Sequence, residues 1–247
     1  MIRKIFLGSC QNGRASECFA LNETASRFMP KKTKAATKQR VPLSKDRVFR
    51  AAVELADEIG IESLSMRRLG LSLGVEAMSL YKHVANKDDI LDGIVEIVAS
   101  EIEAPSVGGD WREAMSRRAT SAHQVLLRHP WATMLIMSRG NVGPAMLRYV
   151  DATIGCLREA GFSYAAADHA WNAIDNHIYG FTLQKVNFPF EPEEYAEVAQ
   201  SFLPMIPPEQ YPYLNGLSQE VIAHRHDGLQ DFSFGLKLIL DGLERLL

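Results

Sequence analysis

Cationic and small polar side chains between positions 65 and 90 are the residues best suited to chemistry in this sequence. Arg67, Lys82 and Lys87 can bind phosphate oxygens, and such contacts hold a protein on DNA without reading its sequence. Ser79 can hydrogen-bond either a base edge or a phosphate. Phosphate-binding cations beside a base-reading residue indicate double-stranded DNA as a partner.

A second group of cations precedes this segment and shows no apolar periodicity. We expect residues 1–43 to be a disordered extension that carries a basic arm, from which Lys38 and Arg40 contact DNA phosphates. The alternative is a solvated tail that keeps the protein soluble. The cations of the arm are Lys31, Lys32, Lys34, Lys38 and Arg40.

Charge and composition restrict the function further. Residues 30–90 contain 12 basic and 8 acidic residues, whereas residues 91–247 contain 11 basic and 20 acidic residues. The acidic second part argues against a structural, sequence-nonspecific DNA-binding protein, which would need basic surface over more of the chain. The chain contains no run of the roughly 18 apolar residues that cross a bilayer. Its 3 scattered cysteines indicate no disulfide framework, so we expect a cytoplasmic protein without a membrane partner.

Two helices with clear start and stop signals must position these side chains. Apolar residues recur at spacings of three and four over residues 45–59, which is typical of one face of a helix. Ser44 can cap the start of this helix, and Gly60 can end it. Ser65 can cap a second, short helix that stops at Gly74.

Two further helices follow the glycine turn. A third short helix is expected over residues 77–83, and Asn86 caps a fourth, with Asp89 completing a capping box. Two short helices around a glycine turn, braced by longer ones, form a helix-turn-helix, whose second helix enters the major groove of DNA. The alternative is a segment of a helical bundle with a solvated charged face.

The third helix divides its residues between a core side and a groove side. Leu80 and Val84 can face the core, which leaves the other side chains for the groove and its phosphate walls. Ala77 or Met78 can then contact a thymine methyl group. The side chains expected on the groove side are Ala77, Met78, Ser79, Tyr81, Lys82 and His83.

The remainder of the chain also shows helical periodicity, so we expect an all-α fold. We expect a helix-turn-helix DNA-binding domain at 44–90 and a larger C-terminal helical domain at 91–247. Four prolines between Pro204 and Gly216 predict a surface loop there. The expected helical segments are 111–128, 131–138, 143–160, 164–186, 193–202 and 229–246.

Residues 44–98 resemble the DNA-binding domain of the TetR family of bacterial transcriptional repressors. The motifs that carry the resemblance are Leu73-Gly74-Val75, Leu80-Tyr81-Lys82-His83 and Asn86-Lys87. The resemblance implies that Ser65 and Arg67 bind the DNA backbone and that Lys87 clamps a phosphate. It also implies base contacts from Ala77, Met78 and Ser79, and backbone or groove-edge contacts from Tyr81, Lys82 and His83. Gly70 departs from the pattern, because the family usually has alanine there, and glycine is expected to loosen the second helix.

Two C-terminal segments resemble the tetracycline-repressor-like branch of this family. Residues 232–244 are similar to its final helix and residues 177–184 to the helix that pairs with it in the dimer interface. The resemblance implies a homodimer that binds a palindromic operator, represses transcription and is released by a small-molecule effector. It places the effector in the C-terminal domain.

Candidate effector-binding residues are apolar, aromatic and polar side chains of the C-terminal domain, the mixture that small-molecule sites require. Each has an alternative role, because polar residues on one helix face often bond to one another or cross a dimer interface. Trp131, directly after Pro130, is also suited to anchor the core. The candidates are His123, Trp131, Met134, Arg139, Asn141, Trp171, Asn172, Asp175, Asn176, Tyr179 and Phe181.

Metal and enzyme hypotheses receive little support from the sequence. His224, His226 and Asp227 could ligate a metal, but residues two apart do not share a helix face, so we expect neither a metal site nor a cofactor. An effector bound as a metal chelate stays open, because some tetracycline-binding relatives take their drug as a magnesium complex. No phosphate loop, GxSxG elbow or HExxH motif is present, which leaves an enzyme with a DNA-anchoring domain as the weaker alternative.

Overall fold

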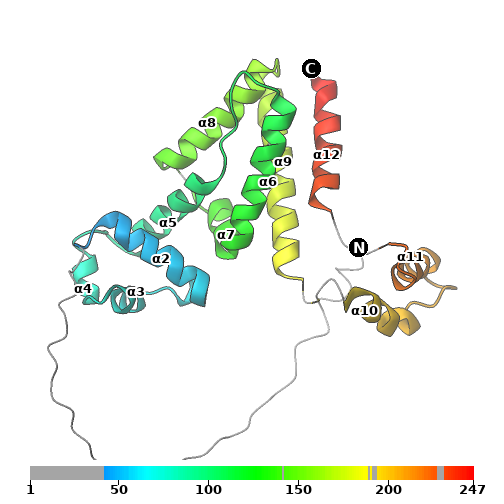
Figure 1. Ribbon diagram of the computed structural model, residues 1–247, viewed down its shortest axis with the longest axis horizontal. Coiled ribbons are helices and arrows are strands. Elements are labelled where there is room, and N and C mark those ends of the chain that lie inside the picture. Colours follow the sequence, from blue (N-terminus) through cyan, green and yellow to red (C-terminus); the bar gives the residue numbers. More distant parts are fainter. Residues whose placement is uncertain (1–41, 141, 189, 191–193, 227–230) are drawn as a thin grey trace, which may run out of the picture.

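The computed structural model describes residues 42–140, 142–188, 190, 194–226 and 231–247. All regular elements in these ranges are helices, which confirms the all-α class (Figure 1). None of the described helices is long and apolar enough to cross a membrane. Three expected site residues, Lys38, Arg40 and Asn141, lie outside the described residues.

The N-terminal helices begin where the capping residues predict. The helices are α2 (Lys45–Ile59), α3 (Met66–Leu73), α4 (Ala77–Leu80) and α5 (Lys87–Glu101). The hydroxyl groups of Ser44 and Ser65 each accept a backbone N–H at 3.3 Å, and Asn86 Oδ1 accepts the N–H of Asp89 at 2.8 Å. The capping box is wrong in one detail, because the Asp89 carboxylate accepts the N–H of Ala85 rather than that of Asn86.

The turn between α3 and α4 depends on two glycines. Gly74 ends α3 with φ +67° and ψ 34°, a left-handed conformation that glycine adopts without steric cost. Gly70 is buried, and a Cβ atom there would lie 2.9 Å from the carbonyl oxygen of Val75 and 3.1 Å from the nitrogen of Ala77. Glycine therefore permits a close approach of α3 to the start of α4. This packing role was not part of the expectation that Gly70 loosens the second helix.

The third helix is shorter than the expected 77–83. Helix α4 ends at Leu80, and residues 81–83 form a turn in which the N–H of His83 bonds to the carbonyl of Leu80 at 2.8 Å. Leu80 and Val84 are 0% and 2% exposed, which confirms their predicted core side.

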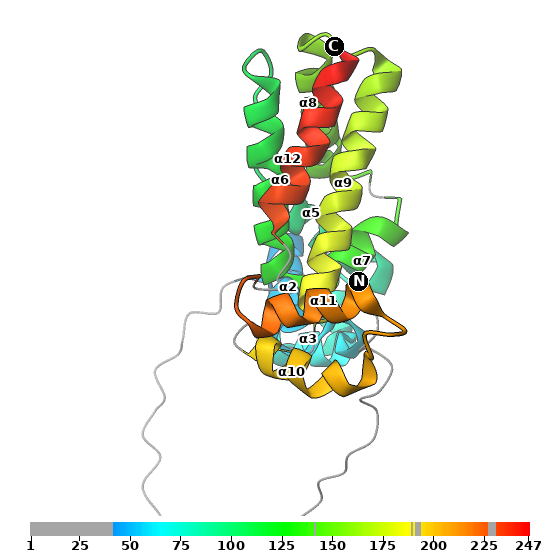
Figure 2. The ribbon, with the colours of Figure 1, turned by 90° about the vertical axis from the view of Figure 1, so that its right-hand side faces the viewer.

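In the C-terminal part, the helices α6, α9 and α12 run side by side, and α8 is inclined to them (Figures 1 and 2). Helix α9 contacts α6, α7, α8 and α12, whereas α5 runs across the expected boundary at residue 90 and contacts both α2 and α8. Most buried apolar residues of the described chain form one cluster that includes residues of both parts. The helices of this part are α6 (Trp111–Arg128), α7 (Pro130–Ser138), α8 (Pro144–Glu159), α9 (Tyr164–Val186) and α12 (Phe232–Leu243).

A separate helix pair projects to one side of the bundle, beyond the end of α9 (Figures 1 and 2). Helices α10 (Tyr195–Phe202) and α11 (Pro212–Ile222) pack on each other around Tyr195, Ala199 and Val221. The predicted loop from Pro204 to Gly216 is therefore wrong, because α11 begins inside it. Pro212 occupies the first helical turn, where the missing N–H of proline costs nothing.

Replacing Gly70 with alanine tests the close approach of α3 to α4. Alanine gains about 0.5–1 kcal/mol of helix propensity, but the overpacking against backbone atoms costs about 1–3 kcal/mol. We expect Gly70→Ala to lower the unfolding free energy by about 1 kcal/mol, as measured by urea denaturation. The control is Gly216→Ala on α11, where a Cβ meets no atom within 4 Å. A Gly70→Ala protein as stable as this control would contradict the close approach.

Candidate functional site

Helix α4 and the residues beside it form the candidate nucleic-acid interface. Helices α3 and α4 lie together at one end of the molecule (Figure 1). Two large side chains of this region are exposed, Met78 at 74% and Tyr81 at 47%. Ala77, Ser79 and His83 are half-buried beside them, and Ser65, Arg67, Lys82 and Lys87 are exposed. Exposed cations around a partly apolar helix surface can hold phosphates while α4 contacts base edges.

Helix α5 is held to the interface by Asp89. The carboxylate accepts the N–H of Ala85 at 3.0 Å and pairs with Lys45 of α2 at 2.9 Å. The hydrogen bond from Ala85, followed by the one from Lys45, lowers the pKa of Asp89 below its usual value. These bonds hold the turn before α5, and with it Lys87, in a fixed position relative to α2.

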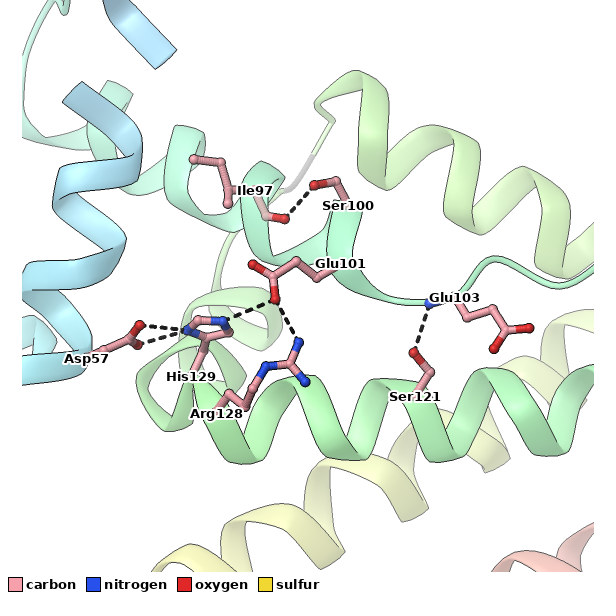
Figure 3. Close-up of polar contacts among 8 residues, drawn as sticks. All are labelled: Asp57, Ile97, Ser100, Glu101, Glu103, Ser121, Arg128 and His129. Atoms are coloured by element: carbon pink, nitrogen blue, oxygen red, sulfur yellow. Dashed lines mark hydrogen bonds and ion pairs between the residues drawn. The ribbon is translucent and has the colours of Figure 1, made fainter. Parts of the chain in front are cut away.

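His129 joins the DNA-binding helices to the C-terminal bundle (Figure 3). Its Nδ1 lies 2.9 Å from a carboxylate oxygen of Asp57 on α2, and its Nε2 lies 3.3 Å from Glu101 at the end of α5. Both ring nitrogens can donate to these carboxylates only when the imidazole carries two protons. Trp131 Nε1 also donates to Asp57, at 2.6 Å.

Glu101 is shared between His129 and Arg128. Arg128 Nη2 lies 2.8 Å from the same Glu101 oxygen that faces His129 (Figure 3). Burial raises the pKa of Glu101, but the hydrogen bond from Arg128 and the charge of His129 outweigh it, so the pKa is lowered. Glu101 is thus held as a carboxylate, and the end of α5 is fixed to the junction of α6 and α7.

A second group of contacts fixes α5 to the segment between α7 and α8 and to the start of α8. Arg139 Nε lies 2.8 Å from Asp92, and Arg139 Nη1 lies 3.2 Å from Asp88. The Glu96 carboxylate accepts the backbone N–H groups of Ala145 and Met146 at 2.7 and 3.1 Å. Arg139, an expected effector residue, is thus engaged with α5.

The remaining effector candidates separate into groups. Trp171, Asp175 and Tyr179 come together on one face of α9. Asn172 bonds to Asp168 within α9. Asn176 is exposed, Met134 is 57% exposed, and Trp131 is buried with its bond to Asp57.

His123 and Phe181 meet at the contact of α6, α9 and α12. His123 Nδ1 lies 2.8 Å from Thr182 Oγ1, and the His123 ring stacks on Phe232 with centroids 4.4 Å apart. Because the Thr182 hydroxyl donates to the carbonyl of Ile178, it accepts the Nδ1–H of His123. Burial lowers the pKa of His123 to about 4, so this imidazole is neutral near pH 7.

The sequence analysis missed Arg118, which lies behind Asp175. Arg118 of α6 is fully buried and pairs with Asp175, whose other oxygen accepts Trp171 Nε1 at 2.7 Å and the Tyr179 hydroxyl at 3.4 Å. The missed signal was the position of Arg118 in a buried face of α6. The other members of that face include Ala114, Met115, Ala119 and Ala122.

Both parts of the chain match families of known proteins. Residues 48–94 match the family "Bacterial regulatory proteins, tetR family", and residues 104–247 match "Tetracyclin repressor-like, C-terminal domain". The HTH-type transcriptional repressor DrrR1 of Streptomyces coeruleorubidus is 33% identical over 83% of this chain and 78% of its own. The class C tetracycline repressor protein of Escherichia coli is 29% identical over 83% of this chain and 92% of its own.

Solved structures agree with these sequence relatives. The complex of the TetR family protein ActR of Streptomyces coelicolor with actinorhodin has a TM-score of 0.70 and 27% identity, over 83% of this chain and 98% of that one. The two family matches together extend over most of the described residues. This chain therefore belongs to the TetR family of bacterial transcriptional regulators, with a helix-turn-helix DNA-binding domain at its N-terminal end.

Proposed function

We propose that this protein is a cytoplasmic repressor that binds a palindromic operator as a homodimer and leaves it when a small molecule binds the C-terminal domain. The observation that carries the proposal is the exposed α4 surface around Met78, flanked by Lys82 and Lys87. The similarity to the repressor DrrR1 supports the repressor role, and the similarity to ActR in complex with actinorhodin supports the binding of a small molecule. We assign operator binding to residues 44–90, with residues 1–43 as a basic arm, and effector binding and dimerisation to residues 91–247.

The outer faces of α9 and α12 supply the proposed dimer interface. Phe234 and Leu238 of α12 are 65% and 57% exposed, and an exposed apolar face of this kind marks an interaction surface. The neighbouring helix α9 exposes Asn176, whose amide can hydrogen-bond across a two-fold interface. Two copies joined here would carry two α4 helices for the two halves of a palindrome.

The contacts of α5 provide a path between the effector and the operator. An effector that moves α6 or α8 also moves the groups that hold α5, which are His129, Arg139 and the N-terminal end of α8. Recognition helices of a dimer fit successive major grooves only when they are about 34–36 Å apart. A shift of α5 in each subunit changes that separation and weakens operator binding.

Recovery of bound genomic fragments by the full chain at physiological salt tests the repressor proposal. We expect enrichment of a palindromic sequence that footprinting shows to be protected. Binding that stays sequence-blind and weakens equally for all DNA as salt rises would support the nonspecific DNA-binding alternative.

Substitutions at Ser79 and Lys87 should separate base reading from phosphate binding. Lys87→Ala should weaken binding to all sequences and reduce the salt slope by about one, because one phosphate contact is lost. Ser79→Ala should change the preferred sequence instead. Binding is measured by fluorescence anisotropy on the selected operator and its point variants, with Lys185→Ala on α9 as the control. The opposite pattern would contradict both assignments.

Replacing His129 tests the junction between the domains. His129→Ala removes the bonds to Asp57 and Glu101 and should lower the unfolding free energy by about 1–3 kcal/mol, because partly buried carboxylates lose a donor. It should also weaken operator binding, since α2 is less firmly held. Urea denaturation and operator titration measure the two effects. The control is Arg225→Ala, which breaks an exposed pair with Glu220 and should change neither the unfolding free energy nor operator binding. A His129→Ala protein with the stability and operator affinity of this control would contradict the role of His129 in joining the two parts.

A further inference from the structure

The most unusual group in the C-terminal domain is the guanidinium of Arg118. Its side chain is 0% exposed, and its Nε and Nη1 atoms have no hydrogen-bond partner among the described residues. Nearly all buried polar groups in proteins have a partner, so two unpartnered nitrogens on one buried cation need an explanation. The free energy cost of removing them from water has already been met by folding.

The surroundings of Arg118 are aromatic. The Arg118 Cζ atom lies 4.8 Å from the centroid of the Tyr149 ring, and Tyr179 and Trp171 bond to the Asp175 oxygen that does not face Arg118. Burial raises the pKa of both tyrosine hydroxyls, so Tyr149 and Tyr179 are neutral phenols. Flat apolar rings beside a cation favour a flat aromatic ligand.

Charge balance selects the polar group of that ligand. Burial lowers the pKa of Arg118, but its interactions, including the charge of Asp175, outweigh burial and raise the pKa, so the guanidinium stays protonated. Asp175 already neutralises this cation through their ion pair. A carboxylate on the ligand would leave a net negative charge in a dry site, which is costly. A carbonyl oxygen supplies the missing acceptor without adding charge.

Access to the network is through Asp175. The Asp175 side chain is 13% exposed, and the Trp171 and Tyr179 side chains that bond to it are half-buried. The unpartnered Arg118 nitrogens are sealed from solvent, so a ligand reaches them only when a neighbouring side chain moves.

We propose that Arg118 is the recognition group for a neutral, planar aromatic effector, and that its Nε and Nη1 donate hydrogen bonds to a carbonyl oxygen conjugated to the ligand ring. The inference rests on the effector-binding role given to this domain under Proposed function, and it names the chemical class of the effector. Tyr149, Tyr179 and Trp171 form the aromatic walls of the site.

Three small probes with one ring system test the chemistry. Fluorenone carries a conjugated carbonyl, fluorene lacks any oxygen, and fluorene-9-carboxylate carries an anion. Titrations of the full chain, followed by quenching of tryptophan fluorescence and by the melting temperature, compare their affinities. We expect fluorenone to bind about tenfold more tightly than either of the other two, which corresponds to one charge-assisted hydrogen bond.

A double variant shows whether Arg118 causes this preference. Arg118→Met alone would leave Asp175 without its cation, so it is combined with Asp175→Leu. Replacing a buried ion pair by apolar residues of similar volume is often neutral or stabilising, so the double variant should fold. It should bind fluorenone and fluorene equally. The matched control, Arg117→Gln/Glu113→Gln, removes an exposed ion pair of the same helix and should keep the preference for fluorenone.

Three results would overturn the inference. They are equal binding of fluorenone and fluorene by the unmodified protein, tighter binding of the carboxylate, and an unchanged preference for fluorenone in the double variant. Operator binding is measured separately in the same proteins. If the unmodified protein binds no specific operator, the repressor proposal fails while the ligand comparison stands; if it binds an operator but shows no preference for fluorenone, only the role of Arg118 fails.

Discussion

The carboxylates of α5 are the interactions on which the arrangement of the two domains depends. Asp89 bonds to the turn before α5 and pairs with Lys45 of α2. Asp92 pairs with Arg139, and Glu96 caps the start of α8. Glu101 binds Arg128 and His129 at the junction of α6 and α7. Most of these partners come from segments distant in sequence. A single exposed ion pair contributes little, but these pairs converge on one helix, and a displacement of that helix disturbs all of them together.

Close steric contacts reinforce these charges. A Cβ atom at Gly93 would overlap the ring of Phe49, and one at Gly143 would overlap the Glu96 side chain. Glycine at these positions lets α2 and the start of α8 pack directly against α5. Because packed interiors resist small deformations, α5 is better suited to move as a rigid body than to bend.

Most of the fold could be predicted from periodicity and capping, and the site only in part. The ranges of α2, α6 and α9 agree with their predicted ranges, because each shows a regular apolar spacing between clear end signals. The loop predicted at Pro204–Gly216 is wrong because proline ends a helix but is also favoured in the first turn of one, where Pro212 lies. Arg118 was missed because apolar periodicity passes over a charged residue even where its neighbours on the same helix face are apolar, and its partner Asp175 lies 57 positions away.

Under the proposed function, the uneven distribution of buried charge gives the effector site a means to act on the operator site. Near the DNA-binding helices, Glu101 has protein partners for its charge, whereas two nitrogens of Arg118 have none among the described residues. We expect a ligand that supplies the missing acceptor to gain most free energy in the conformation of α6 and α9 that presents both nitrogens to it. Differential binding of this kind is the condition for a population shift. Linkage then requires that operator DNA lower the affinity for the ligand by the same factor by which the ligand lowers the affinity for DNA. In the proposed function, the incomplete hydrogen bonding of Arg118 is therefore the feature on which selection by the ligand depends.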